Sequence, residues 1–132
     1  MSQKIRTGDV VKLDAATDVG WWMNVFDALP DATFISHARS GRIQVANKAC
    51  KTLLGYDIGF MLGRTTMELG MFETKAQRDA LVEAALASTT FVESPFWAVN
   101  NELKQGQFSI CEVEYAGTPT LINIIRDITA EK

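Results

Sequence analysis

The chain has 132 residues, of which 47% are apolar and 22% are charged, and its formal net charge is −3 at pH 7. This length and composition indicate one domain, and the acidic balance, with no cluster of Lys and Arg, argues against a nucleic-acid-binding protein. No apolar stretch approaches the roughly 20 residues that cross a bilayer, and residues 1–18 lack the apolar segment of a signal peptide, so we expect a cytoplasmic protein without a membrane segment.

The first predicted elements are an N-terminal arm over residues 1–17 and a flanking helix over residues 18–30. Asp18 is a good N-cap, and the apolar residues that follow it have helical spacing: Trp21, Trp22, Val25, Phe26 and Leu29. Because adjacent residues lie about 100° apart around a helix, one tryptophan can face the core while the other extends an apolar patch. Core packing and a homodimer contact through Trp21, Trp22 and Phe26 are both open.

A hairpin is predicted next, with strands over residues 32–37 and 43–46 and a tight turn that contains Gly41. Asn47 can cap a short helix that ends at Gly55. Glycines then recur too often for one long helix, so residues 57–69 are predicted to form short helical turns.

The second clear helix begins at Thr74, where Thr74-Lys75-Ala76-Gln77 has capping-box spacing. Its predicted apolar face consists mostly of small residues: Ala76, Ala80, Leu81, Ala84 and Ala85. Three strands follow over residues 90–99, 104–115 and 120–126, with turns at residues 100–101 and 116–119. Pro95 lacks an N–H for the ladder and predicts an edge strand. This order of elements indicates an antiparallel α+β domain with its helices on one face of the sheet.

Short fragments along the chain match a known pattern in order and spacing. They are Phe26-Asp27-Ala28-Leu29-Pro30-Asp31-Ala32, Gly41-Arg42-Ile43, Ala46-Asn47-Lys48-Ala49-Cys50, Leu54-Gly55-Tyr56, Leu62-Gly63-Arg64, Gly117-Thr118-Pro119 and Ile125-Arg126-Asp127-Ile128-Thr129-Ala130-Glu131-Lys132. From about Trp21 to the last residue the chain resembles a PAS domain of the bacterial sensory type. The resemblance implies a five-stranded antiparallel sheet in the order 2-1-5-4-3, a core over residues 31–128 and the start of a C-terminal signalling helix over residues 129–132. One departure lies at residues 100–106, where the family's Lys-Asp-Gly-like turn is absent and we expect a remodelled turn.

The resemblance also implies a function without catalysis. A PAS module of this kind binds a small apolar or organic ligand, dimerises, or does both, and regulates a C-terminal effector such as a histidine kinase or a diguanylate cyclase of cyclic-di-GMP signalling. Asp127 and Thr129 stand where the last strand meets the outgoing helix, so both can cap that helix, and the resemblance adds a role in coupling the two. The alternative is a purely structural dimerisation or transduction domain with a filled core. A third hypothesis is an enzyme that uses paired carboxylates such as Glu112 and Glu114. Side chains alternate along a strand, however, and this alternation predicts that both carboxylates face solvent.

Known cofactors of similar domains fit this sequence poorly. In the flavin-binding light sensors a Cys forms the photo-adduct, and Thr66 of Gly63-Arg64-Thr65-Thr66 stands in its place, where a hydroxyl cannot replace a thiolate. Haem-binding relatives carry an axial His on the long helix, whereas the single histidine of this chain is His37 on a predicted strand. His37 with the separated Cys50 and Cys111 also gives too few ligands for a zinc site. We therefore expect no flavin photo-adduct, no haem and no metal.

An apolar pocket between helices and sheet is the remaining candidate site. Its predicted lining comprises Ile35, Leu53, Leu54, Tyr56, Phe60, Met61, Leu62, Met67, Leu81, Trp97, Cys111 and Asn123. Asn123 interrupts an apolar strand, where an unpaired buried amide would cost about 1–3 kcal/mol, and the methionines suit an adaptable pocket. These residues either fill the core or surround a ligand that the amide anchors.

Overall fold

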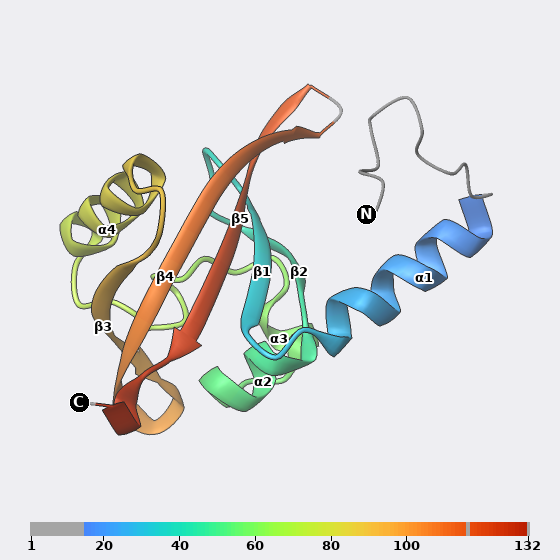
Figure 1. Ribbon diagram of the computed structural model, residues 1–132. Helices are drawn as coiled ribbons and strands as arrows, with labels where there is room; N and C mark the ends of the chain where they lie inside the picture. The colour runs from blue at the N-terminus through green and yellow to red at the C-terminus, as the bar shows by residue number, and fades with distance from the viewer. Residues whose placement is uncertain (1–14, 116, 132) are drawn as a thin grey trace, which may run out of the picture.

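Residues 15–115 and 117–131 are described by the computed structural model of the protein. They form a five-stranded antiparallel sheet in the order β2-β1-β5-β4-β3, with α2 and α4 packed against it (Figure 1). This is the sheet order and the α+β layering that the sequence predicted.

Helix α1 (Ala15–Ala28) projects away from the sheet (Figure 1). It begins three residues before the predicted start at Asp18, because Ala15 and Ala16 have the highest helix propensity and extend it. Residues 15–17 therefore belong to the helix and not to the predicted arm, and the rest of that arm, residues 1–14, lies outside the described residues.

The hairpin strands β1 (Ala32–His37) and β2 (Ile43–Ala46) have the predicted bounds. Helix α2 (Lys48–Leu54) is capped by the Asn47 side chain, which accepts a hydrogen bond from the Cys50 N–H. Gly55 ends α2 with a φ of 86°, and a Cβ there would lie 2.2 Å from a Val99 methyl, so no other residue fits. As predicted, this segment forms no single long helix: the short helix α3 (Ile58–Met61) is followed by turns.

Helix α4 (Lys75–Ala87) begins with the predicted cap, in which the Thr74 hydroxyl accepts the Gln77 N–H at 3.1 Å. The predicted apolar face is wrong in part, because Leu81 and Ala85 are buried while three of its members are exposed: Ala76, Ala80 and Ala84. The buried side instead continues through the half-buried Val82. Leu81 and Val82 remove more apolar area from water than an alanine row could, which sets the rotation of the helix on the sheet.

The three C-terminal strands are β3 (Val92–Ala98), β4 (Glu102–Tyr115) and β5 (Thr118–Asp127). The strand that contains Pro95 lies at the sheet edge, as predicted. Strand β5 starts two residues before its predicted start, so Thr118 and Pro119 pair with β4 and the turn is shorter than expected. The 3₁₀ turn η2 (Val99–Asn101) connects β3 to β4, and the 3₁₀ turn η3 (Thr129–Glu131) follows β5.

The remodelled turn that we expected within residues 100–106 is confined to the 3₁₀ turn before β4, and residues 102–106 belong to the strand. Asn100 and Asn101 both have positive φ, at 62° and 58°. Asparagine tolerates this left-handed conformation better than other non-glycine residues. Two consecutive asparagines thus make the tight reversal, and β4 begins at Glu102, two residues before its predicted start.

The core lies between the sheet and the helices and is closed by aromatic rings. Phe96 and Phe108 meet edge to face with ring centroids 5.7 Å apart. Gly106 lies beneath them, and a Cβ there would come within 2.9 Å of Phe96 and 3.1 Å of Ile125. The absence of a side chain at this position lets the rings approach the β4 backbone and fill the interior.

Candidate functional site

The predicted pocket is almost filled. Near Asn123 the structure has an internal void of about 20 Å³, whose lining includes Phe34, Ser36, Phe72, Leu81, Phe108 and Ile110. One water needs roughly 10–15 Å³ of such volume, so the void has room for about one water molecule. Side chains therefore fill most of the space between the helices and the sheet.

The amide nitrogen of Asn123 finds its partners within the protein. Its side chain is buried, and Nδ2 donates to the Phe34 carbonyl at 3.2 Å, to the Ser36 hydroxyl at 3.0 Å and to the Leu121 carbonyl at 3.3 Å. Its Oδ1 has no hydrogen-bond partner among the described residues, and a single water in the void can donate to it. The buried amide therefore needs no organic ligand to be satisfied.

The other residues predicted to line the pocket are spread over three environments. Leu53, Leu54 and Met61 are buried in the core, and Tyr56 and Met67 pack against it half-buried. Phe60 and Leu62 are exposed. Trp97 lines a surface cleft beside Phe72 and Glu73. Of the twelve predicted residues, only Leu81 and Asn123 line the void.

Two predicted residues lie on the wrong face of the sheet. Ile35 and Cys111 both pair with Ile122, whereas Phe34 pairs with Asn123. Because side chains alternate between faces along a strand, Ile35 and Cys111 are on the face opposite the void. The same alternation, applied to β1, would have selected Phe34 and Ser36 from the sequence.

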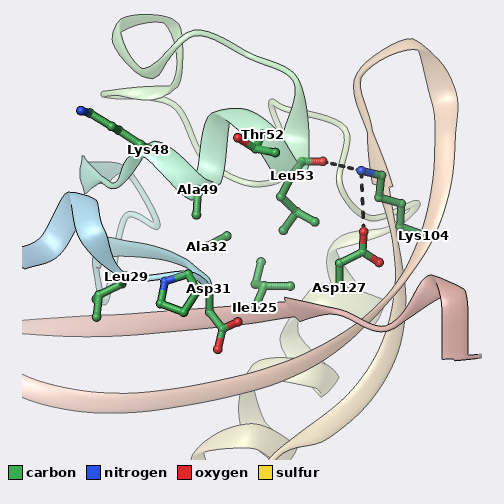
Figure 2. A pocket seen from close by; sticks show the side chains of 11 residues that line it. Leu29, Asp31, Ala32, Lys48, Ala49, Thr52, Leu53, Lys104, Ile125 and Asp127 are labelled. Carbon is green, nitrogen blue, oxygen red and sulfur yellow. Dashed lines mark hydrogen bonds and ion pairs between the residues drawn. The ribbon is translucent and has the colours of Figure 1, made fainter.

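An open groove of about 440 Å³ lies where the α1–β1 linker, α2 and the end of β5 meet (Figure 2). Ala32, Ala49, Leu53 and Ile125 contribute its apolar surface, and the charged residues Asp31, Lys48, Lys104 and Asp127 also line it. The groove brings together the segment that enters the core and the segment that leaves it.

Lys104 links α2 to the end of β5 at this groove. Its Nζ donates to the Leu53 carbonyl at 2.8 Å and lies 3.9 Å from Asp127 Oδ2, as the dashed lines in Figure 2 show. Asp127 Oδ1 accepts the Thr129 N–H at 2.9 Å and its hydroxyl at 2.5 Å, and the Thr129 hydroxyl accepts the Gln105 N–H at 3.0 Å. Asp127 thus caps the outgoing segment, which over the described residues is the 3₁₀ turn η3.

The pKa of the Asp127 carboxyl reflects these contacts. Partial burial acts to raise it, but the hydrogen bonds from Thr129 and the positive charge of Lys104 outweigh burial and hold the pKa below its ordinary value. Asp127 is therefore ionised at neutral pH, and as a carboxylate it accepts both Thr129 donors.

Asn47 joins α1 to the core, a role that sequence reasoning missed beyond the helix cap. Its Oδ1 accepts the Thr33 N–H at 2.9 Å, while Nδ2 donates to the carbonyls of Phe26 at 3.1 Å and Asp31 at 3.0 Å. Asp27 adds a second link by accepting the Lys48 N–H at 3.2 Å. The signal in the sequence was an amide at the cap position, since an amide accepts at its oxygen and offers two N–H donors at its nitrogen.

Beyond this attachment α1 presents exposed aromatic surface. Trp21 and Trp22 are 50% and 60% exposed and contact each other edge to face, with centroids 5.1 Å apart. Neither tryptophan is part of the core, so of the two possibilities left open by the sequence, core packing does not hold for Trp21 or Trp22. Phe26 is half-buried near the end of the helix.

His37 and Cys50 occupy structural positions, whereas Cys111 is exposed. His37 Nδ1 accepts the N–H groups of Arg39 and Ser40, at 3.2 and 3.3 Å, and so closes the β1–β2 turn. Cys50 is buried, which raises the pKa of its thiol to about 11 and keeps it protonated. Within residues 15–115 and 117–131, no three His, Cys, Asp or Glu side chains gather as metal ligands. In the same part of the chain, every helix is too short or too polar to span a membrane.

Residues 21–87 match the family model of the PAS domain. No curated protein sequence matches the chain.

Solved PAS structures are similar to the chain. The PAS domain of an HTR-like protein from Haloarcula marismortui aligns with a TM-score of 0.69 and 19% identity, over 86% of this chain and 93% of that one. A PAS domain from Colwellia psychrerythraea aligns with a TM-score of 0.71 and 19% identity, over 86% and 98%. A PAS domain from a two-component sensor histidine kinase aligns with a TM-score of 0.69 and 8% identity, over 86% and 99%. At these identities the similarity is one of fold.

Proposed function

The chain belongs to the PAS domain family, and we propose that it is a sensory and signal-transduction module with a filled core, which dimerises through α1 and acts on an effector joined beyond β5. The observation that carries this proposal is the internal void of about 20 Å³. It supports the filled-core alternative over the binding of a small apolar ligand within the domain.

The small volume of the void also bears on whether a flavin or a haem can bind inside the domain. A flavin or a haem is a multi-ring molecule, and ligand pockets for organic molecules span about 300–1,000 Å³. Thr66, which replaces the adduct-forming cysteine, lines the void, and a hydroxyl forms no photo-adduct. We therefore propose that the module works without flavin photochemistry and without haem.

Dimerisation through α1 is supported by its exposed aromatic surface. Trp21, Trp22 and Met23 are each 45% exposed or more, and large apolar patches on a protein surface usually mark an interface. The hydrogen bonds of Asn47 and Asp27 hold the C-terminal end of α1 to the core. A second copy packed on α1 would thereby be linked to β1 and α2.

The output is proposed to pass through the junction at the end of β5. Lys104, Asp127 and Thr129 connect α2 and β4 to the outgoing segment. A similar fold occurs in a PAS domain from a sensor histidine kinase, which supports a histidine kinase as the class of effector. A diguanylate cyclase is the alternative effector that the resemblance implies. A non-catalytic role in a bacterial cytoplasm is part of the same proposal.

The test of dimerisation is the molar mass in solution, measured by light scattering after size exclusion. We expect the wild-type chain to be a dimer and Trp22→Glu to be a monomer, because a buried charge at the interface is costly. Phe91→Glu is the matched control, since Phe91 is also exposed, at 44%, but lies outside α1. A monomeric wild type, or a Trp22→Glu variant that stays dimeric, would contradict the proposal.

A further inference from the structure

A cationic cleft lies on another part of the surface from the junction groove. It has a volume of about 240 Å³ and is lined by the β1–β2 turn, by residues 65–67 and by the first turns of α4: Arg39, Ser40, Gly41, Thr65, Thr66, Met67, Lys75 and Arg78. Three of these residues are cations, three carry hydroxyl groups and none is a carboxylate. A concentration of positive charge is unexpected on a chain whose net charge is −3.

Two of the three cations are paired with a carboxylate. Asp79 stands behind two of them, accepting Lys75 Nζ at 2.7 Å and Arg78 Nη1 at 3.0 Å. The Arg78 side chain is only 22% exposed, and its Nη2 lies 3.6 Å from where a Cβ on Gly41 would stand. Its guanidinium is therefore packed against the β1–β2 turn. Arg39 has no carboxylate partner among the described residues.

The hydroxyl groups have protons to donate. Ser40 Oγ accepts the Arg42 N–H at 3.3 Å, and Thr65 Oγ1 accepts the Glu68 N–H at 3.1 Å. In both bonds the hydroxyl is the acceptor, so its own proton remains available to an anion. The nearest acidic side chain of that segment is engaged elsewhere, because Glu68 accepts the Thr65 N–H and lies 3.7 Å from Arg42.

We propose that this cleft binds a small oxyanion with two or more negative charges, carried on phosphate or carboxylate groups. Its volume of about 240 Å³ is below the roughly 300–1,000 Å³ of pockets for drug-sized organic ligands, which suits a compact anion. Arginine suits such groups because its planar fork donates two parallel hydrogen bonds to one phosphate or carboxylate. This inference goes beyond the proposed function, since the cleft does not involve α1 and binding there does not require a dimer.

The cleft is also adjacent to the core. Gly41, Thr66 and Arg78 line both the cleft and the internal void beside Asn123. An anion that draws Arg78 outward would change the packing around that void. The cleft can therefore be an input site for a domain whose interior has no room for a ligand.

The test is calorimetric titration of the full chain at low ionic strength with two probes, inorganic pyrophosphate and tricarballylate. Saturable binding of either supports the site, and the stronger probe identifies the phosphate or the carboxylate source. Arg78→Gln is expected to weaken binding by at least about tenfold, because it removes a charge-assisted hydrogen bond. Arg39→Gln, in an exposed turn, is expected to weaken binding without affecting folding, and it keeps the test valid if Arg78→Gln fails to fold.

The matched control is Arg126→Gln, which removes the same charge from a residue that pairs with Asp31 and does not line the cleft. It should leave the affinity within about twofold of wild type. The proposal is overturned if neither probe binds saturably, or if Arg126→Gln weakens binding as much as Arg39→Gln does. Dimer mass is measured in the same samples, so that a failure of the α1 interface is distinguished from a failure of this site.

Discussion

At the scale of single residues, two asparagines show how a polar side chain is used inside an apolar core. Asn47 is fully buried and accepts and donates hydrogen bonds to groups in four segments of the chain. Asn123 donates to three acceptors on β1 and β5. A buried amide is stable only when such partners are present, and the hydrogen bonds of both asparagines therefore fix the relative positions of elements.

Replacing Asn47 with alanine removes its hydrogen bonds and leaves the Thr33 N–H and two carbonyls without this partner. We expect the free energy of unfolding to fall by roughly 2–4 kcal/mol, given about 1 kcal/mol for each lost bond and more for groups left unpaired. Urea denaturation measures the change. Asn24→Ala is the control, since Asn24 is exposed on α1, and it should change stability by less than about 0.5 kcal/mol. An equal effect of the two variants would show that Asn47 does not link the elements.

Ionisation of Asp127 makes the free energy of unfolding depend on pH in the acid range. Its pKa is lower in the folded protein than the unfolded value of about 3.9. Its contribution is thus fully present above that unfolded value and is lost as pH falls through the folded pKa. Because its side chain is 40% exposed, the contribution is below about 1 kcal/mol.

The measurement for Asp127 is the unfolding free energy of wild type and Asp127→Asn between pH 2 and pH 7. The stability difference in favour of wild type should be constant near neutral pH and shrink in acid. Asp79, whose pKa is also lowered, by its hydrogen bonds to Lys75 and Arg78, is present in both proteins, so its contribution cancels in the comparison. A difference that does not depend on pH would contradict the role assigned to the ionised carboxylate.

At the scale of elements, packing of the β3–β4 hairpin against β5 decides whether the domain has a pocket. Strand β4 contributes Phe108 and Ile110 to the interior, and its Gly106 leaves room for the rings of Phe96 and Phe108. Helix α4 places Leu81 over the same region. The pocket expected from the sequence is occupied because a glycine on the strand and aromatic residues beside it allow close approach.

Gly106→Ala tests this account of the core. The added methyl would lie 2.9 Å from Phe96 and 3.0 Å from Phe108, closer than van der Waals contact. Overpacking of this kind costs about 1–3 kcal/mol, and we expect that loss of stability in chemical denaturation. Gly59→Ala is the control, because nothing lies within 4 Å of a Cβ at Gly59. An unchanged stability for Gly106→Ala would mean that the core is looser than described.

At the scale of the whole molecule, the proposed functions are assigned to different parts of the domain. Helix α1 is the proposed dimer contact, the junction at the end of β5 is the proposed output, and the core is filled. The void of about 20 Å³ leaves too little volume for an organic ligand inside the domain. Helix α1 supplies apolar surface on one side of the chain, and the cationic cleft supplies charge on another. Input and association are therefore expected at the surface, with the sheet connecting them to the outgoing segment.

The mass of the native protein tests the filled core. Native mass spectrometry of the protein purified from cells should show the mass of the chain, or of its dimer, with no bound molecule. Leu81→Ala should enlarge the void, lower stability by about 2–5 kcal/mol and allow benzene to raise the thermal midpoint, as apolar cavities do. Leu86→Ala, at a position of α4 that is 40% exposed, is the control. A bound organic molecule in the wild-type protein would overturn the filled-core proposal.

The local pattern of the sequence was enough to predict much of the fold. The bounds of β1 and β2, the caps at Asn47 and Thr74 and the edge position of the Pro95 strand follow from alternation, side-chain oxygens at helix starts and the missing N–H of proline. These features depend on neighbours along the chain, so their signal is contained in a few consecutive residues. The fragments that resemble a PAS domain supplied the sheet order.

The sequence by itself therefore determined the elements, the family and the scarcity of reactive side chains, whereas the tertiary structure decided which residues meet. Ile35 and Cys111 were expected in the pocket, but strand register places them on the opposite face. Arg39, Lys75 and Arg78 are distant in sequence and share one cleft only after folding. The physical reason is that a pocket is the space left after side chains from several segments have packed. Its volume depends on contacts such as that of Gly106 with Phe96, which no local pattern encodes.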